Sequence, residues 1–245
     1  MPSTTTPWLI NPNPRPLAHR RLFCFPYAGG AARTYQPWTT ALPPQIEVCI
    51  VELPGHGRRW AEPPITQLAP LIESLQIAMQ PWLDKPFLFF GHSLGALIAF
   101  ELARSLQNHY NLLPDLFWVS AARAPHLPAS NPPLHLLPKA DFMAELRRYS
   151  GTPEAVLANA ELMALLLPML RADFRLLETY RYQEQGPLSC PITACWGESD
   201  TIVSPEEVKA WGIHTNHAFS LEKISGDHFF IHQTPLLQRL MAKLA

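Results

Sequence analysis

A serine flanked by glycines, set between a short apolar run and a helix-like run, constrains this chain more than any other feature. Residues 91–95 read Gly-His-Ser-Leu-Gly, after the apolar run 86–90 and before the helix-favouring run 96–103. A strand that turns this sharply into a helix strains its central residue, and small neighbours relieve the crowding. The Ser93 hydroxyl then projects beside the free N–H groups and positive dipole end of the helix. The pattern predicts a nucleophile whose intermediate is an oxyanion.

Apolar runs alternate with helix-like segments through much of the chain. We expect strands at 22–25, 47–53, 116–121, 192–196 and 218–224, and helices at 35–42, 65–83 and 234–244. This alternation predicts an α/β fold with a mostly parallel, doubly wound sheet. Because catalytic loops gather beyond the carboxyl ends of such strands, we expect Ala28, Ser93, Arg123 and the segment after Trp196 to converge.

The alternation is interrupted between about residues 125 and 185. We expect helices there at 140–149, 153–158 and 159–182, and no strand, so this segment is predicted to be a helical insert over the sheet. The apolar positions at helical spacing form one stripe: Leu162, Leu165, Leu166, Met169, Leu170, Phe174 and Leu177. The stripe fits core packing and a lid over a substrate channel equally well, and both interpretations stay open.

The length of 245 residues favours one globular domain, which we place at 21–245. Residues 1–20 are expected to be an extended, poorly ordered arm, because Pro12, Pro14 and Pro16 disfavour regular structure. The start of the chain has neither the cationic residues nor the apolar run of a secretory signal, so we expect a cytoplasmic protein.

The charge and hydropathy patterns exclude several kinds of partner. A net charge of −1, with 16% charged residues, provides no basic stripe for nucleic acid and no polybasic segment for anionic lipid. The longest apolar stretch, 162–170, contains Pro168 and is far shorter than the roughly 20 residues of a membrane span. We therefore expect neither nucleic acid nor membrane as a partner.

The four cysteines are expected to be buried, reduced thiols. Cys24 and Cys49 lie in apolar, strand-like runs, and Cys190 and Cys195 are spaced too widely for a Cys-x-x-Cys motif. In a chain of this length without an export signal, two disulfides are the lesser alternative, and a zinc site is disfavoured further.

A serine nucleophile needs a base, and the base needs a carboxylate that orients it. In the order typical of this architecture the acid follows the serine on a loop after a later strand, and the histidine comes nearer the C-terminus. Asp200 follows the predicted strand 192–196, and His228 follows the predicted strand 218–224. We predict Ser93 as nucleophile, His228 as base and Asp200 as the orienting acid.

Other acids fit this role less well than Asp200. Glu198 lies on the same loop and is the nearest alternative. Asp115 precedes its strand and is therefore expected at the opposite edge of the sheet, whereas Asp141 and Asp173 belong to the helical insert.

Other histidines also fit less well than His228. His214 and His217 precede the last predicted strand, and His232 falls in the turn or helix after it. His92 is adjacent to the nucleophile, but on a sharp turn its side chain points away from Ser93, so we interpret it as structural.

Two backbone N–H groups are expected to bind the oxyanion. One belongs to Leu94, at the start of the helix, and the other comes from the loop after the first predicted strand, where Ala28 is the best candidate. Gly29 and Gly30 follow Ala28 and allow the chain to turn its amides inward, although the same pair could simply form a tight turn.

The motif series resembles that of the type II thioesterases, free-standing α/β-hydrolases that accompany nonribosomal peptide and polyketide synthases. The motifs are Phe-Pro-Tyr-Ala-Gly-Gly at 25–30, Leu-Pro-Gly-His-Gly-Arg at 53–58, Gly-His-Ser-Leu-Gly-Ala at 91–96, Ser-Ala-Ala-Arg-Ala-Pro at 120–125 and Gly-Asp-His-Phe-Phe at 226–230. The similarity runs from about Arg21 to the C-terminus. Leu94, where the family often has Met, and Ala121-Ala122, in place of a glycine-containing pair, depart from the pattern.

The resemblance implies an α/β-hydrolase fold with a mobile helical lid at about 125–185. It implies hydrolysis of unwanted acyl or aminoacyl groups from the phosphopantetheine arm of acyl or peptidyl carrier proteins, which restores stalled synthases. The family's triad maps onto Ser93, Asp200 and His228, and its oxyanion amides onto Ala28 and Leu94. No metal or organic cofactor is implied, and we expect a monomer.

Alternatives to this function remain. The same site could release medium-length acyl chains from a fatty acid synthase or hydrolyse small esters, and a silent hydrolase-fold protein could bind a carrier without catalysis. Scattered arginines could meet an acidic carrier helix or the phosphopantetheine phosphate, although such residues are more often solvated surface. They are Arg20, Arg21, Arg33, Arg58, Arg59, Arg147 and Arg148.

Overall fold

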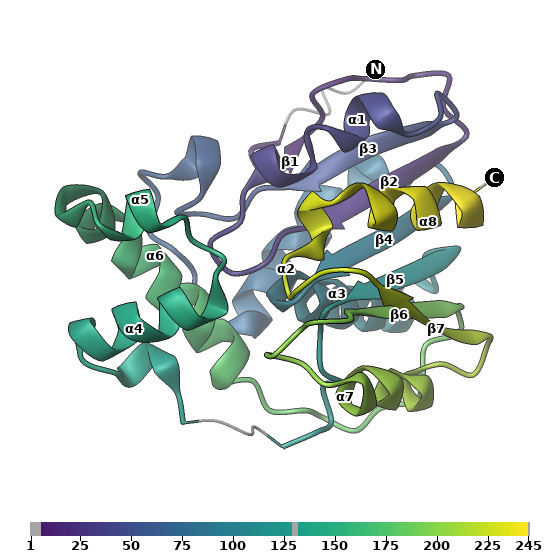
Figure 1. Ribbon diagram of the computed structural model, residues 1–245. Helices are drawn as coiled ribbons and strands as arrows, with labels where there is room; N and C mark the ends of the chain where they lie inside the picture. The colour runs from purple at the N-terminus through teal and green to yellow at the C-terminus, as the bar shows by residue number, and fades with distance from the viewer. Residues whose placement is uncertain (1–5, 129–131, 245) are drawn as a thin grey trace.

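A seven-stranded sheet forms the centre of the structure, a computed structural model that describes residues 6–128 and 132–244 (Figure 1). The strand order is β1-β3-β2-β4-β5-β6-β7, and every neighbouring pair is parallel except β1 with β3. The strands are β1 (Leu9–Ile10), β2 (Arg20–Phe25), β3 (Ile46–Val51), β4 (Phe87–His92), β5 (Leu116–Ser120), β6 (Ile192–Gly197) and β7 (Phe219–Ile224).

Helices cover both faces of this sheet, as the predicted doubly wound arrangement requires: α2 (Leu68–Met79), α3 (Leu94–Tyr110) and α7 (Pro205–Lys209) pack on one face, and α1 (Trp38–Ala41) and α8 (Thr234–Leu244) on the other. The insert contributes α4 (Lys139–Tyr149), α5 (Glu154–Leu157) and α6 (Ala160–Glu178). Side chains alternate along β2, so that Phe23 and Phe25 pack with α2 and α3, and Leu22 and Cys24 pack with α1 and α8. The order of the strands, their parallel pairing and the two helical layers form an α/β-hydrolase fold.

Most expected elements are present, with shifted ends. The expected helix at 35–42 is a short 3-10 turn at Ala32–Tyr35 followed by α1, because Pro37 has no N–H to continue a helix and instead caps the next one. The expected helix at 65–83 is α2 with a further 3-10 turn at Gln80–Trp82. All four cysteines are buried free thiols, as predicted.

The N-terminal arm is bound to the sheet. Leu9 and Ile10 pair antiparallel with Val51 and Ile50 of β3. The Arg15 guanidinium donates hydrogen bonds to the carbonyl oxygens of residues 39, 42, 43 and 46, and its backbone N–H bonds to Glu47. The expectation of a poorly ordered arm is therefore wrong for residues 9–15.

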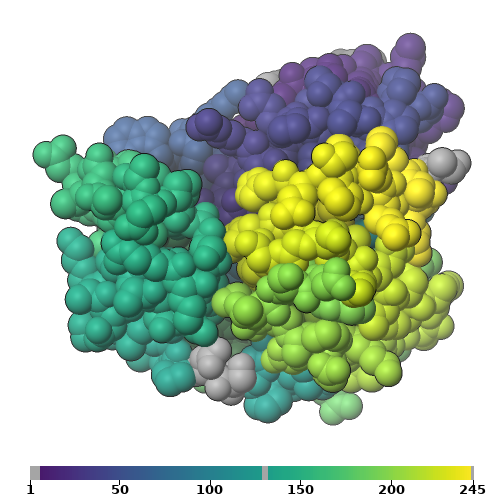
Figure 2. Space-filling view, viewed as in Figure 1, coloured from purple at the N-terminus to yellow at the C-terminus, as the bar shows by residue number. Residues whose placement is uncertain are grey.

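The insert forms a separate lobe beside the sheet, on the left in Figure 2. Its helices α4, α5 and α6 enclose their own hydrophobic cluster, which includes Phe142, Met163 and Phe174. The apolar stripe of α6 is only partly buried, since Leu165 is 70% exposed while Phe174 is 5% exposed.

Among the described residues, no helix combines the length and apolarity that crossing a membrane requires.

Candidate active site

Ser93 lies at the sharp turn between β4 and α3, with φ 52° and ψ −118°. Its N–H donates to the Ser120 carbonyl oxygen at 2.8 Å, which ties the turn to the end of β5. The flanking glycines are sterically required. A Cβ on Gly91 would lie 2.4 Å from Ala96 Cα, and one on Gly95 would lie 2.1 Å from the Phe25 carbonyl oxygen. The sequence thus places Ser93, in a strained backbone conformation, at the N-terminus of a helix.

Asp200 and His228 meet beside this turn. The Asp200 side chain is fully buried after β6, and its Oδ1 accepts hydrogen bonds from the N–H groups of Ile202 and Val203. Its Oδ2 lies 2.8 Å from His228 Nδ1. With the Nδ1 proton donated to the carboxylate, Nε2 of His228 is available to accept a proton.

The other acid on this loop faces away. Glu198 forms a surface ion pair with Lys223 at 2.6 Å, and its side chain is 51% exposed. The structure therefore pairs His228 with Asp200 and not with the nearest alternative.

His92 holds the backbone of His228 in place. Its Nε2 donates to the His228 carbonyl oxygen at 2.9 Å, and its Nδ1 lies 2.9 Å from Ser120 Oγ. A carbonyl oxygen only accepts, so Nε2 carries the proton and Nδ1 accepts from the hydroxyl. Complete burial lowers the pKa of His92 well below its usual value and keeps the ring neutral. The structural interpretation of His92 becomes specific: it positions the predicted base.

The other candidate histidines do not line the cavity beside Ser93. His214 is buried, with Nε2 2.8 Å from His126 Nδ1, and His217 is exposed. His232 Nε2 lies 3.0 Å from the Tyr27 hydroxyl. Arg123, expected to converge on the site, approaches Glu207 at 3.9 Å and does not line the cavity beside Ser93.

A narrow cavity of about 40 Å³ separates the ends of the strands from the insert. Ser93, His228 and Ala28 line one wall, and apolar side chains of α4 and α6 line the other. The complete lining is Tyr27, Ala28, Ser93, Leu146, Tyr149, Gly151, Thr152, Leu170, Phe174, Leu177, His228 and Phe229. This volume holds only a few water molecules, each of which needs roughly 10–15 Å³, so a longer acyl group requires the insert to move.

Of the two predicted oxyanion donors, Ala28 lines this cavity and Leu94 directly follows Ser93, which also lines it. Leu94 begins α3, and Ala28 lies in the loop after β2. In that loop the Gly30 N–H donates to the Tyr27 carbonyl oxygen at 2.8 Å, and the Gly29 N–H donates to Asp173 Oδ2 at 2.7 Å. Within residues 6–128 and 132–244, no hydrogen-bond acceptor is assigned to the N–H groups of Ala28 and Leu94.

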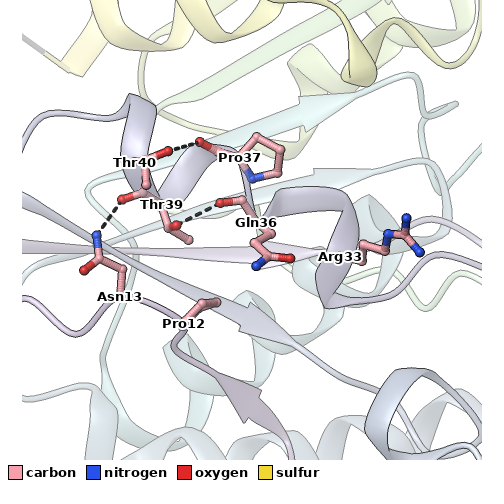
Figure 3. Close-up of a pocket in the computed structure, with 7 residues that line it drawn as sticks. All are labelled: Pro12, Asn13, Arg33, Gln36, Pro37, Thr39 and Thr40. Atoms are coloured by element: carbon pink, nitrogen blue, oxygen red, sulfur yellow. Dashed lines mark hydrogen bonds between the residues drawn. The ribbon is translucent and has the colours of Figure 1, made fainter.

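A second hollow, shown in Figure 3, is larger but lacks acid–base groups. It has a volume of about 650 Å³ and lies between the N-terminal arm and α1. Two of its polar side chains bond to backbone within the hollow: Asn13 donates to the Thr39 carbonyl oxygen, and the Thr39 hydroxyl donates to the Gln36 carbonyl oxygen. The lining is Pro12, Asn13, Arg33, Gln36, Pro37, Thr39 and Thr40. We therefore assign no chemistry to this hollow.

The sequence did not reveal the contact between two residues that lie outside the cavity lining, Asp173 and His56. Asp173, considered above only as an acid of the insert, is 2% exposed and bonds both the Gly29 N–H and His56 Nε2. A usable signal was present, because an aspartate between Leu170 and Leu177 interrupts the apolar face of a helix, where an unpaired charge would be costly.

Comparisons with known proteins agree over nearly the whole chain. A thioesterase domain family model matches residues 20–244. Gramicidin S biosynthesis protein GrsT of Aneurinibacillus migulanus is 44% identical over 232 residues, covering 95% of this chain and 91% of that protein. Thioesterase PikA5 of Streptomyces venezuelae is 39% identical over 226 residues, covering 92% and 80%. The solved structure of the type II thioesterase BorB from the borrelidin biosynthetic cluster has a TM-score of 0.88 and 36% identity, covering 97% and 98%.

Proposed function

Because this chain belongs to the thioesterase domain family, among the type II thioesterases of nonribosomal peptide and polyketide pathways, we propose that it hydrolyses acyl and aminoacyl thioesters on carrier proteins of such a synthase. The resemblance identified from the motif series is thereby confirmed. The observation that carries the proposal is one cavity with Ser93 and His228 on its polar wall, Asp200 behind His228, and an apolar insert opposite.

The proposed reaction has two acyl-transfer steps. His228 Nε2 takes the Ser93 proton as Oγ attacks the thioester carbonyl, and the N–H groups of Ala28 and Leu94 stabilise the oxyanion. Collapse breaks the C–S bond, and the phosphopantetheine thiolate takes the proton from His228. Water then attacks the acyl-enzyme with His228 again as base, and the acid product leaves with Ser93 restored.

Asp200 acts on His228 and not on the substrate. Its Oδ2 fixes the tautomer that leaves Nε2 facing the cavity and stabilises the imidazolium formed in each step. Since a thiolate leaves readily, the greater task is to position the carbonyl against Ser93 and the two N–H groups. Side chains and backbone supply every group in this scheme, and the phosphopantetheine arm belongs to the substrate, so the proposal includes no cofactor.

The proposed partner is an acyl or peptidyl carrier domain. Not all of the candidate arginines can meet it, because Arg21 and Arg59 are buried in ion pairs with Glu47 and Glu62. Arg33 and Arg58 are at least partly exposed, and the structure assigns no ion pair to them among the described residues. These two are the better candidates for contact with an acidic surface.

Release of medium-length acyl chains is the second candidate function, favoured by the apolar lining from Leu146, Leu170 and Leu177. The cavity volume of about 40 Å³ favours short groups instead. The substrate range of the enzyme distinguishes the two.

The test is intact-protein mass spectrometry of carrier proteins loaded in parallel with acetyl, aminoacyl and octanoyl groups. We expect loss of acetyl and aminoacyl groups with the wild-type enzyme, and a fall in turnover with Ser93→Ala on the order of 10⁶-fold, the scale at which triad serines contribute. Loss confined to octanoyl carriers would assign chain release. Near-normal hydrolysis by Ser93→Ala would overturn the proposed nucleophile.

A further inference from the structure

A buried carboxylate of the insert reaches the loop that carries a predicted oxyanion donor. Asp173 on α6 has a side chain only 2% exposed, and its Oδ2 accepts the Gly29 N–H at 2.7 Å. The same oxygen lies 2.8 Å from His56 Nε2. One carboxylate thus joins α6, the loop after β2 and the loop after β3.

The hydrogen bonds identify the charge on His56. Its Nδ1 lies 3.1 Å from the Pro54 carbonyl oxygen, which can only accept, so Nδ1 carries a proton. Its Nε2 faces the Asp173 oxygen that already accepts from Gly29, so Nε2 also carries one. Burial alone would lower the pKa of His56, but attraction to Asp173, its hydrogen bonds and the nearby Glu52 carboxylate together raise that pKa. The result is a buried imidazolium–carboxylate pair.

This pair holds the loop after β2 from the side of the insert. Gly29 has φ +80°, and a Cβ there would lie 2.7 Å from Leu170 Cδ2, so the loop is pressed against α6. The body of the protein holds the far end of the loop, where Glu52 Oε1 accepts the Ala32 N–H at 3.1 Å. The Gly29 anchor therefore comes from the insert and the Ala32 anchor from the sheet.

The Gly29 anchor bears directly on Ala28. The bond from Gly29 N–H to Asp173 fixes the peptide plane that follows Ala28, and the turn closed by Gly30 N–H and the Tyr27 oxygen fixes the segment around it. Two fixed planes leave the Ala28 N–H little freedom to turn away from the cavity. When α6 moves away from the sheet, it takes one of these constraints with it.

We propose that Asp173 is a positioning residue that couples the docking of α6 to the orientation of the Ala28 oxyanion donor. With the insert docked, the donor is held for catalysis. With the insert displaced, as entry of a longer acyl group requires, the donor loses its anchor and the acyl group is not cleaved until α6 returns. This inference rests on the proposed thioesterase mechanism and adds a reason for closure beyond the exclusion of water.

The test compares Asp173→Asn with Glu178→Gln. Glu178 is also on α6, and it also accepts backbone N–H bonds and pairs with a histidine, but its partners Leu134 and His135 lie within the insert. It serves as a matched control for the loss of a carboxylate. We expect Asp173→Asn to lower kcat about 10- to 100-fold, below the roughly 10²- to 10³-fold effect of deleting an oxyanion donor. KM should change less than threefold, and acetyl and octanoyl carriers should lose kcat equally.

A second measurement reports the mobility of the loop after β2. Amide hydrogen exchange of a peptide that covers residues 26–32 should accelerate in Asp173→Asn and stay at the wild-type rate in Glu178→Gln. If Asp173→Asn does not fold, His56→Gln, which removes the imidazolium and keeps the carboxylate, should show the same changes to a smaller extent.

Three results would overturn the coupling: unchanged kcat in folded Asp173→Asn, an equal loss in Glu178→Gln, or a rise in KM for octanoyl carriers alone. The wild-type and Ser93→Ala enzymes are measured in the same assay. Absence of wild-type hydrolysis would reject the thioesterase mechanism, whereas normal wild-type hydrolysis with an unaffected Asp173→Asn would reject only the coupling.

Discussion

The two walls of the cavity are held in different ways. On the wall formed by the sheet, the backbone turn and directional bonds fix the predicted reacting groups: Ser93 by the turn into α3, and His228 by its bonds with Asp200 and His92. On the wall formed by the insert, residues such as Leu170 and Phe174 are held by apolar packing. Hydrogen bonds tolerate little displacement, whereas apolar contacts can repack. We therefore expect the sheet wall to carry the reacting side chains and the insert wall to select acyl groups, with the bond from Gly29 to Asp173 as the point where the insert also acts on the chemistry.

The largest expected effect comes from a substitution in the sheet wall, Asp200→Asn. Asp200→Asn keeps an acceptor for the Ile202 and Val203 N–H groups but presents an amide to His228, which favours the tautomer with Nε2 protonated. We expect kcat to fall on the order of 10⁴-fold, measured at saturating acetyl carrier.

Glu198→Gln is the matched control, because it alters a carboxylate on the same loop that pairs only with Lys223. Its kcat should equal that of the wild type. A fall in kcat of less than tenfold in Asp200→Asn would show that catalysis does not depend on this acid.

An intermediate effect is expected on the insert wall. Phe174 packs edge-on against Phe142 and Tyr149 and lines the cavity. Phe174→Leu should enlarge the cavity and raise the octanoyl-to-acetyl ratio of kcat/KM about tenfold, the low end of what one methylene is worth in an apolar pocket.

Phe142→Leu makes the same chemical change in the same cluster, but Phe142 does not line the cavity. It should lower stability and leave the ratio unchanged. An equal shift in both variants would mean that general loosening of the insert, and not the cavity wall, sets the preference.

The smallest effect concerns the His56–Asp173 pair between the two walls. Because the pKa of His56 is raised in the folded state, its stabilisation is complete below the unfolded value of about 6.5 and is lost as pH rises through the folded pKa. The groups that face it are Asp173 and Glu52. Above pH 6.5, the wild-type free energy of unfolding should fall with pH more steeply than that of His56→Gln, by at most about 1.4 kcal/mol per pH unit. Urea unfolding at several pH values measures both slopes.

His214 provides a reference residue whose effect on stability has the opposite pH dependence. Burial, with His126 and Arg104 nearby, lowers its pKa to about 4, so its stabilisation is present above about pH 6.5 and is lost as pH falls toward 4. Replacing His214 with Leu should flatten the acid side of the stability curve and leave the alkaline side unchanged. A His56→Gln curve parallel to the wild type above pH 6.5 would contradict the charged pair.

Local patterns predicted the sheet wall well. The turn at Ser93 depends on its own glycines and on the adjoining runs, and Asp200 and His228 follow strands that their apolar residues reveal. Strand β1 was not predicted, because two residues among prolines acquire a strand only by pairing with β3. Such pairing is a property of the folded chain and not of the segment.

The end of α6 and the role of Asp173 depended on distant contacts. The expected helix to residue 182 ends at Glu178, where Tyr180 bonds Glu101 and the Gln183 carbonyl bonds Arg104, both on α3. Asp173 and His56 are 117 residues apart, so no window of sequence contains both. Local propensity cannot predict either contact, although a carboxylate on an apolar helix face signals that a partner exists.

The strained backbone at Ser93 has a consequence for how duplicated copies of such a protein evolve. A side chain held at φ 52° costs about 1–3 kcal/mol, a cost that glycine does not incur. On the proposed mechanism, only selection for turnover retains the serine there, since folding alone favours its loss. We expect a single substitution to glycine to make a duplicated copy, once released from catalysis, both inactive and more stable. Retired copies should therefore persist as well-folded proteins and not as unstable ones.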